Sequence, residues 1–106
     1  MKNIIAEAAN LSSLVDYQDG SVVSKEIFKN QSGTMTLFAF AQGQGLSEHK
    51  TPFDAFVYIV DGEADITISG ILNKVTTGEI IHMPAGEPHA LKANKQFKML
   101  LSMMKA

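Results

Sequence analysis

The sequence predicts an all-β domain, either an antiparallel sandwich or a barrel. Short runs of β-branched, aromatic and other apolar residues recur along the chain, and Gly, Pro, Asn and Asp residues separate them. These turn signals return about every eight to twelve residues, a spacing typical of antiparallel β domains. The composition, with 45% hydrophobic and 19% charged residues, is that of an ordinary globular protein. We therefore expect roughly eight or nine short strands in one domain.

The N-terminal part is predicted to hold an arm followed by two strands. Residues 1–20 form the arm, in which residues 3–14 fit a strand, a short helix or a flexible segment equally well. Strands are expected at residues 22–29 and 34–41, separated by a turn of Asn, Ser and Gly. The second of these strands carries apolar residues on both faces, as in the interior of a sandwich. A glycine-rich connector follows at residues 42–47.

The remainder of the chain continues the alternation of strands and turns. A strand at residues 53–60 is followed by Asp61-Gly62, which predicts a two-residue hairpin turn of type I′. The strand after this turn alternates between apolar and other residues, so Ile66 and Ile68 are expected to face a core. Further strands are expected at residues 71–77, 78–83, 89–93 and 97–104.

Size, charge and cysteine content limit the partners and the cellular location that can be expected. One domain, residues 1–106, is expected, and a chain this small gains by burying surface between copies, so we expect a homodimer. No apolar run approaches the roughly 18 residues of a spanning helix, so no membrane partner is expected. The absence of cysteine fits a reducing compartment and predicts a cytoplasmic location. All nine basic residues are Lys and the net charge is −2, so nucleic acid is not an expected partner.

A histidine follows a turn in the C-terminal part of the chain. Gly78 is followed after five residues by Pro84, after one more by Gly86 and after two more by His89. The proline and glycine stop the preceding apolar run, and Pro88 keeps the chain extended so that His89 starts the next strand. The spacing therefore predicts an imidazole at the rim of a sheet.

A second histidine lies upstream, between two glycines at fixed spacings from it. His49 follows Gly43 after five residues, Thr51 lies two positions further on, and Ala55 precedes Gly62 by seven positions. The glycine-rich connector therefore leads directly to His49.

The segments at residues 43–62 and 78–93 together resemble the two signature motifs of the small single-domain cupins. With the strands on either side, the likeness covers nearly the whole chain. The resemblance implies a double-stranded antiparallel β-helix, or jelly-roll barrel, in which the two motifs supply strands on facing walls of one pocket. It also implies that His49 and His89 converge there.

Cupins with the complete motifs hold a divalent transition metal through three histidines and a glutamate. By this resemblance His49 and His89 are the ligands that the chain keeps, whereas Thr51 and Ala55 replace the second histidine and the glutamate. Such nitrogen and oxygen sites suit Zn, Ni, Mn or Fe, and two imidazoles without a carboxylate would hold the ion weakly. Asp54 is one position early, so its side chain is expected on the opposite face, where it accepts backbone N–H bonds and holds the loop.

The third histidine, His82, has three interpretations, of which one is direct contact with a bound small molecule. If Glu79 points outward, positions 80 and 82 point inward, and His82 becomes a third nitrogen beside the other two imidazoles. Alternatively, His82 is a half-buried strand residue that is hydrogen-bonded to a neighbour.

Methionine is frequent in the sequence and could indicate a site for a soft metal. Thioethers bind copper, but methionine more often fills gaps in a core, and no cysteine accompanies it here. Packing is therefore the predicted role of Met35, Met83, Met99, Met103 and Met104.

These observations predict a barrel whose pocket, lined by His49, His82 and His89, binds a small molecule. The contact is either direct or through a weakly held divalent metal on these histidines. Two alternatives stay open. One is a metal-dependent enzyme, a dioxygenase or an isomerase, in which water or a nearby group replaces the glutamate. The other is a non-catalytic sensing or assembly module that acts through its dimer surface.

Overall fold

The structure, a computed structural model, describes residue 4 and residues 6–106. Over these residues the chain forms one short 3-10 helix and eight β-strands, so the all-β prediction is confirmed. No helix in this part of the chain is long and apolar enough to cross a membrane. The elements are η1 (Leu11–Ser13), β1 (Val22–Asn30), β2 (Gly33–Phe40), β3 (Gly45–His49), β4 (Phe53–Ile68), β5 (Ile71–Thr76), β6 (Ile80–Met83), β7 (His89–Lys92) and β8 (Phe97–Lys105).

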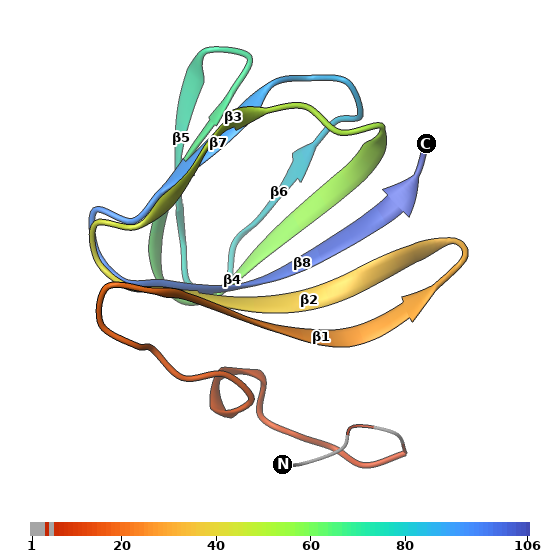
Figure 1. Cartoon of the computed structure of the whole chain (residues 1–106), viewed down its shortest axis with the longest axis vertical. Helices are drawn as coiled ribbons and strands as arrows, with labels where there is room; N and C mark the ends of the chain where they lie inside the picture. The colour runs from red at the N-terminus through yellow and green to blue at the C-terminus, as the bar shows by residue number, and fades with distance from the viewer. Residues whose placement is uncertain (1–3, 5) are drawn as a thin grey trace.

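The strands form two curled walls that share β4 (Figure 1). One wall consists of β1, β2, β8, the first half of β4 and β6. The other consists of β3, β7, the second half of β4 and β5. All of these pairings are antiparallel, as the sequence predicts. The walls meet where β4 passes from one to the other, and the barrel interior lies between them.

The predicted hairpin turn at Asp61-Gly62 is wrong. β4 continues through both residues, and its register against β8 shifts between Ile59 and Asp61. Gly62 has a φ of 90°, and a Cβ atom there would overlap the carbonyl oxygen of Gln96. The glycine therefore permits a bulge and the close approach of another backbone segment instead of a chain reversal. Because a bulged strand bends, this one strand can serve both walls.

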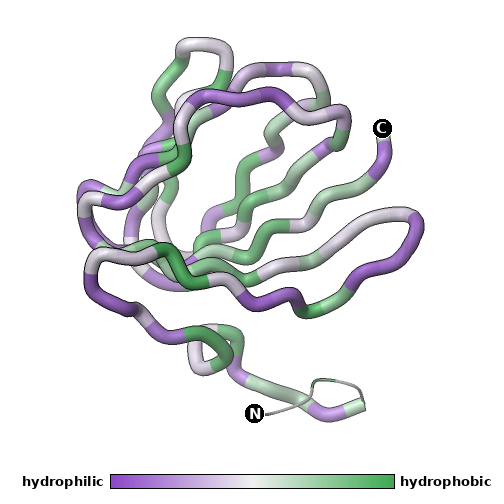
Figure 2. Tube along the Cα trace, in the orientation of Figure 1, coloured by the Kyte–Doolittle hydropathy of each residue, from purple (hydrophilic) through white to green (hydrophobic). Residues whose placement is uncertain are grey.

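The barrel interior is filled by an apolar cluster drawn from both walls. Phe40 and Phe97 stack with their ring centroids 4.6 Å apart, and Ile66 is fully buried. Ile68 packs against the same cluster, so the prediction for Ile66 and Ile68 is confirmed. Figure 2 shows that β8 and the first half of β4 are largely hydrophobic, whereas β3 and the loop after it are mostly hydrophilic.

The N-terminal arm covers part of the outer face of the larger wall. Leu11 and Val15 pack against Leu37 and Ala39, which point away from the barrel interior on β2. Of the three structures that the sequence allowed for the arm, the described part is a short helix with irregular chain around it. The first positions of the predicted arm, 1–3 and 5, lie outside the described residues.

Candidate functional site

Two histidines from the two sequence motifs meet at the edge of the barrel interior. His49 ends β3 and His89 begins β7, and the two residues are partners in the antiparallel register. Their Nε2 atoms are 3.1 Å apart, and the rings meet edge to face with centroids 4.3 Å apart. The structure thus brings these two side chains together. It does so on neighbouring strands of one wall, not on facing walls as we expected.

Local chain geometry explains how the second motif presents its histidine. Gly86 adopts a φ of 81° in the turn after β6, a conformation that favours glycine. Its N–H donates a 2.9 Å hydrogen bond to the carbonyl oxygen of Thr51, so the turn is tied to the loop of the first motif. The chain then runs through Pro88 and enters β7 at His89, where the sequence predicts the strand to begin.

Backbone carbonyls determine which nitrogen of each ring carries hydrogen. His49 Nδ1 lies 2.8 Å from the carbonyl oxygen of Ser47, and His89 Nδ1 lies 3.3 Å from that of Glu87. Because a carbonyl oxygen only accepts, both Nδ1 atoms are assigned as N–H donors. In the neutral rings both Nε2 atoms then carry lone pairs that face each other. Two such lone pairs repel at this distance unless a proton or a cation lies between them.

Burial keeps the inner ring in its neutral form. His89 is 4% exposed, and this burial lowers its pKa below the ordinary value of 6.5. The positive charge that His49 can carry lowers the pKa of His89 further. A neutral imidazole with a free Nε2 is the form that binds metal ions. His89 is therefore prepared as a ligand at neutral pH.

A cavity of about 40 Å³ adjoins the two rings. Cavities that hold drug-sized molecules measure about 300–1,000 Å³, whereas a cavity of this size holds only a few waters. The walls are mainly aliphatic and sulfur-containing, and no carboxylate belongs to the lining that the structure describes. The lining residues are Leu46, His49, Thr51, Ala55, Met83, His89, Leu91, Met99, Leu101 and Met103.

The cavity also contains the two positions that differ from the complete motif. Thr51 and Ala55 both line it, opposite the strands that carry the histidines. The Thr51 hydroxyl lies 3.3 Å from the carbonyl oxygen of Phe53, to which it donates, and 3.4 Å from the N–H of the same residue. Ala55 is 2% exposed. The alignment of the first motif is therefore consistent with the geometry, because its three ligand positions, His49, Thr51 and Ala55, border one space.

His82 does not join the other two histidines, and the inward orientation predicted for it is wrong. Its side chain is 45% exposed on the outer face, where Nε2 lies 2.9 Å from Asp54 Oδ1. The ring stacks on Phe56 with centroids 4.5 Å apart. The prediction fails because Glu79 lies before β6, in a turn where its carboxylate accepts the N–H of Thr76. Its orientation therefore does not indicate which residues of β6 point inward.

Asp54 lies on the face opposite Ala55, as its position in the strand predicts. Its carboxylate accepts the N–H of Ala85 at 3.1 Å in addition to the hydrogen of His82. These two bonds, first that from His82, lower the pKa of Asp54. The interpretation of His82 as a strand residue hydrogen-bonded to a neighbour matches this arrangement, and Asp54 holds the loop that contains Ala85.

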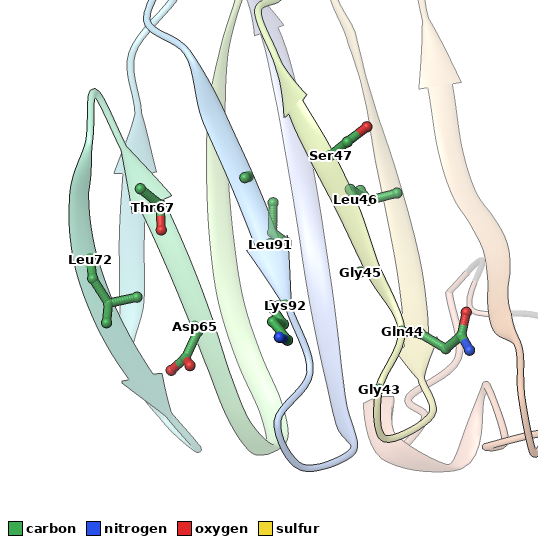
Figure 3. Close-up of a pocket in the computed structure, with 11 residues that line it drawn as sticks. Gly43, Gln44, Gly45, Leu46, Ser47, Asp65, Thr67, Leu72, Leu91 and Lys92 are labelled. Atoms are coloured by element: carbon green, nitrogen blue, oxygen red, sulfur yellow. The ribbon is translucent and has the colours of Figure 1, made fainter.

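A larger groove of about 450 Å³ lies on the same wall as the histidines, along β3, β7 and the second half of β4 (Figure 3). Asp65, Thr67 and Lys92 line it together with the backbone of β3, and none of the three histidines does. The carboxylate of Asp65 is already engaged by Asn94 and lies 3.3 Å from Lys74 Nζ. Because the Asp65 carboxylate has partners and no motif histidine lines the groove, we place the candidate site in the smaller cavity.

A comparison with protein-family models identifies a cupin domain over residues 36–103. The chain belongs to the cupin family. Among solved structures, a conserved protein of unknown function from Streptococcus pyogenes is 37% identical, with 99% of this chain and 93% of that chain covered and a TM-score of 0.92. A cupin superfamily protein from Desulfitobacterium hafniense is 28% identical over 99% of this chain and 97% of that chain, again with a TM-score of 0.92.

A third similar structure is a cupin 2 conserved barrel domain protein from Leptotrichia buccalis. It is 39% identical, and the match covers 92% of this chain and 47% of that chain with a TM-score of 0.88. No curated protein matches the chain. The comparisons therefore establish the cupin barrel and leave the activity to be argued from the site.

The metal centre of the complete cupin motif does not fit this donor set. Among the described residues, no group of three or more His, Cys, Asp and Glu side chains could hold an ion together. The two imidazoles supply nitrogen donors, but the third histidine and the carboxylate that would balance a divalent charge are replaced by Thr51 and Ala55. Any cation at this cupin's histidine pair must therefore be held by fewer or different donors.

Three methionines border the site. Met83, Met99 and Met103 line the cavity beside the histidines, and all three also pack in or against the apolar core cluster, so the packing role predicted for them is confirmed. Met83 precedes Pro84 directly and shares the strand face of position 81, which the sequence itself displays. The contribution from β8 depends on strand pairing, which the sequence does not display.

Proposed function

We propose that this cupin is a binding protein whose barrel holds a metal cation at His49 and His89, with room beside the ion for a ligand of only a few atoms. The observation that carries the proposal is the pair of Nε2 atoms 3.1 Å apart at the wall of a small cavity. Two metal–nitrogen bonds of about 2.0–2.1 Å, at an angle of about 90–110°, separate their nitrogens by about 2.8–3.4 Å. The separation supports two neighbouring ligands of one ion.

The hydrogen bonds behind the rings support the same proposal. Each Nδ1 is directed to a backbone carbonyl, that of Ser47 or that of Glu87. In metal sites such outer bonds fix the tautomer and the orientation of ligating histidines. Here they orient both Nε2 atoms toward one point without any rearrangement of the backbone.

The same geometry supports binding more than catalysis. A dioxygenase or isomerase needs room for a substrate beside the metal, and a cavity of about 40 Å³ admits only a few atoms besides an ion. General acid or base chemistry would need a titratable group besides the metal ligands, and the cavity lining contains only Thr51 as a further polar side chain. We therefore favour a binding or sensing role for the site.

Calorimetric titration of the metal-free protein tests the proposal. Zn(II) and Ni(II) are the probes, and we expect saturable binding of one ion per chain with a dissociation constant in roughly the micromolar range. Two imidazoles without a carboxylate account for the modest affinity. Binding of several ions with equal weakness, or no heat above that of dilution, would contradict the proposal.

The homodimer stays a prediction that the small size of the chain supports. Apolar side chains also remain on the outside of the single chain, since Phe28, Ile71 and Ile80 are 56%, 68% and 64% exposed. A second copy would cover part of such surface. Sedimentation equilibrium should give twice the chain mass of 11.5 kDa, and a mass of one chain at all concentrations would contradict the prediction.

A further inference from the structure

Three thioether sulfurs share the cavity with the two imidazoles. Met83 is 3% exposed and Met99 is 1% exposed, and Met103 packs against the same apolar cluster. All three side chains line the cavity with His49 and His89. The site thus contains five donor side chains, of which the proposed function so far uses two.

The strand register places two of these methionines on either side of one small residue. Ala55 on β4 is the register partner of Met83 on β6 and of Met103 on β8. Ala55 stands where the cupin motif has its glutamate. Because Ala55 carries only a methyl group, the space that the glutamate carboxylate would fill is left open. The thioethers of Met83 and Met103 flank this space from the two neighbouring strands.

Met99 differs from the other two methionines in its position along the wall. Its partner on β4 is Ile59, which lies further along the strand than Ala55 does. Between them, Val57 pairs with Leu101 and Ile81, so an aliphatic layer separates Met99 from the open carboxylate position. Met99 therefore lines the cavity without flanking the open carboxylate position, and only the two methionines beside Ala55 are considered as ligands.

The chemistry of the lining favours a soft ion of low charge. A divalent cation among these aliphatic walls would meet no anionic side chain, and an uncompensated charge in such surroundings is costly. Neutral imidazole and thioether donors suit Cu(I), which carries one charge and prefers sulfur. Methionine side chains are flexible enough to turn their sulfur toward an ion without moving the strands.

We propose that the cavity is a Cu(I) site in which Met83 and Met103 supply thioether ligands beside Nε2 of His49 and His89. This inference rests on the proposed binding of a cation by the histidine pair, and it adds which ion is preferred and by which residues. The thioethers take the place that the missing carboxylate would occupy. They thereby change the preference of the site from hard divalent ions to a soft monovalent ion.

Anaerobic competition with a chromophoric Cu(I) chelator measures the relevant affinity, with Zn(II) calorimetry in parallel. The double variant Met83→Leu/Met103→Leu is expected to lower Cu(I) affinity at least tenfold and to change Zn(II) affinity by less than twofold. The control Met104→Leu, at an exposed position of the same strand that does not line the cavity, is expected to leave both affinities unchanged. Leu replaces Met with nearly equal volume, so the fold should tolerate the changes. Thermal unfolding of each variant checks this.

The outcomes separate this inference from the function on which it rests. If His89→Gln removes Cu(I) binding but the methionine double variant keeps full affinity, the thioether assignment is overturned and the histidine site stands. If the wild-type protein binds neither Cu(I) nor Zn(II), both proposals fall. X-ray absorption of the Cu(I)-loaded wild-type protein needs no substitution, and a spectrum without sulfur neighbours at copper would overturn the assignment even if the double variant were unstable.

Discussion

The cupin contains two close pairs that involve histidine, and they differ in the atom that faces the ring nitrogen. Inside the barrel, the Nε2 atoms of His49 and His89 face each other. On the outer face, His82 Nε2 faces a carboxylate oxygen of Asp54. A carboxylate only accepts, so His82 Nε2 must carry hydrogen and has no lone pair to offer a metal. The inner pair is incomplete without a proton or a cation, whereas the outer pair is complete by itself.

This difference teaches that the partner of a histidine, and not its presence in a motif, indicates its role. The outer pair also holds a loop, because Asp54 accepts the N–H of Ala85. The inner pair fixes no such loop. The Nδ1 atoms of its two histidines bond only to backbone carbonyls two residues away in the chain. Substitutions that affect one pair and spare the other therefore sharpen the comparison.

Removal of one inner imidazole should have the largest effect. His89→Gln or His49→Gln is expected to lower Zn(II) affinity at least about 100-fold, since loss of outer-shell partners alone costs about 10–100-fold. His82→Gln is the matched control and should change the affinity by less than about twofold. Calorimetric titration of the three variants measures this. An equal loss in all three would show that the two pairs do not differ as described.

Restoration of the missing ligands should strengthen the inner site. The double substitution Thr51→His/Ala55→Glu is expected to raise Zn(II) and Ni(II) affinity at least about tenfold, or about 1.4 kcal/mol, because both positions line the cavity. The larger side chain at the buried Ala55 should also cost about 1–3 kcal/mol of stability in the metal-free protein. Asp54→Glu, on the opposite face, is the control. Unchanged titration curves would refute the alignment of the first motif.

The pH dependence of stability should reveal the inner ring. Because the pKa of folded His89 is lowered from 6.5, by burial first and by His49 second, the unfolded chain binds its proton at higher pH than the folded chain. The free energy of unfolding is therefore highest above about pH 6.5 and declines as pH falls through the lower pKa of the folded state. Urea unfolding at several pH values should show this decline in wild type and a shallower one in His89→Gln. Equal slopes of the unfolding free energy against pH in the two proteins would contradict this prediction.

Loss of the outer carboxylate should have the smallest effect. Asp54→Asn removes an exposed group whose pKa is lowered from 3.8 by His82 and by the backbone of Ala85. A lowered pKa stabilises the fold above the unfolded value and loses this contribution as pH falls below it. The melting temperature of the variant should therefore lie slightly below that of wild type at pH 7, and the difference should disappear as the pH falls through the lowered pKa of the folded state. Metal titration of the same variant should match wild type.

The fold was largely predictable because the alternation of apolar residues and the positions of turn residues determine most of the strands. Alternation identified the faces of Ile66 and Ile68, and the Pro84 to Gly86 turn identified the start of β7. The hairpin predicted at Asp61-Gly62 failed because the same dipeptide serves a reversal and a bulge, and only the approach of Gln96 on the neighbouring chain segment decides between them.

The site was predictable only in part. The spacing of the two motifs is a property of the sequence by itself, and it determined that this chain has a cupin barrel with His49 and His89 as its remaining motif histidines. The tertiary structure decided that His82 lies outside and that Met83 and Met103 flank Ala55. The physical reason is that a strand's faces depend on where its pairing begins, and neighbours across a sheet depend on register. Both are set by contacts between segments far apart in the chain, which no local pattern contains.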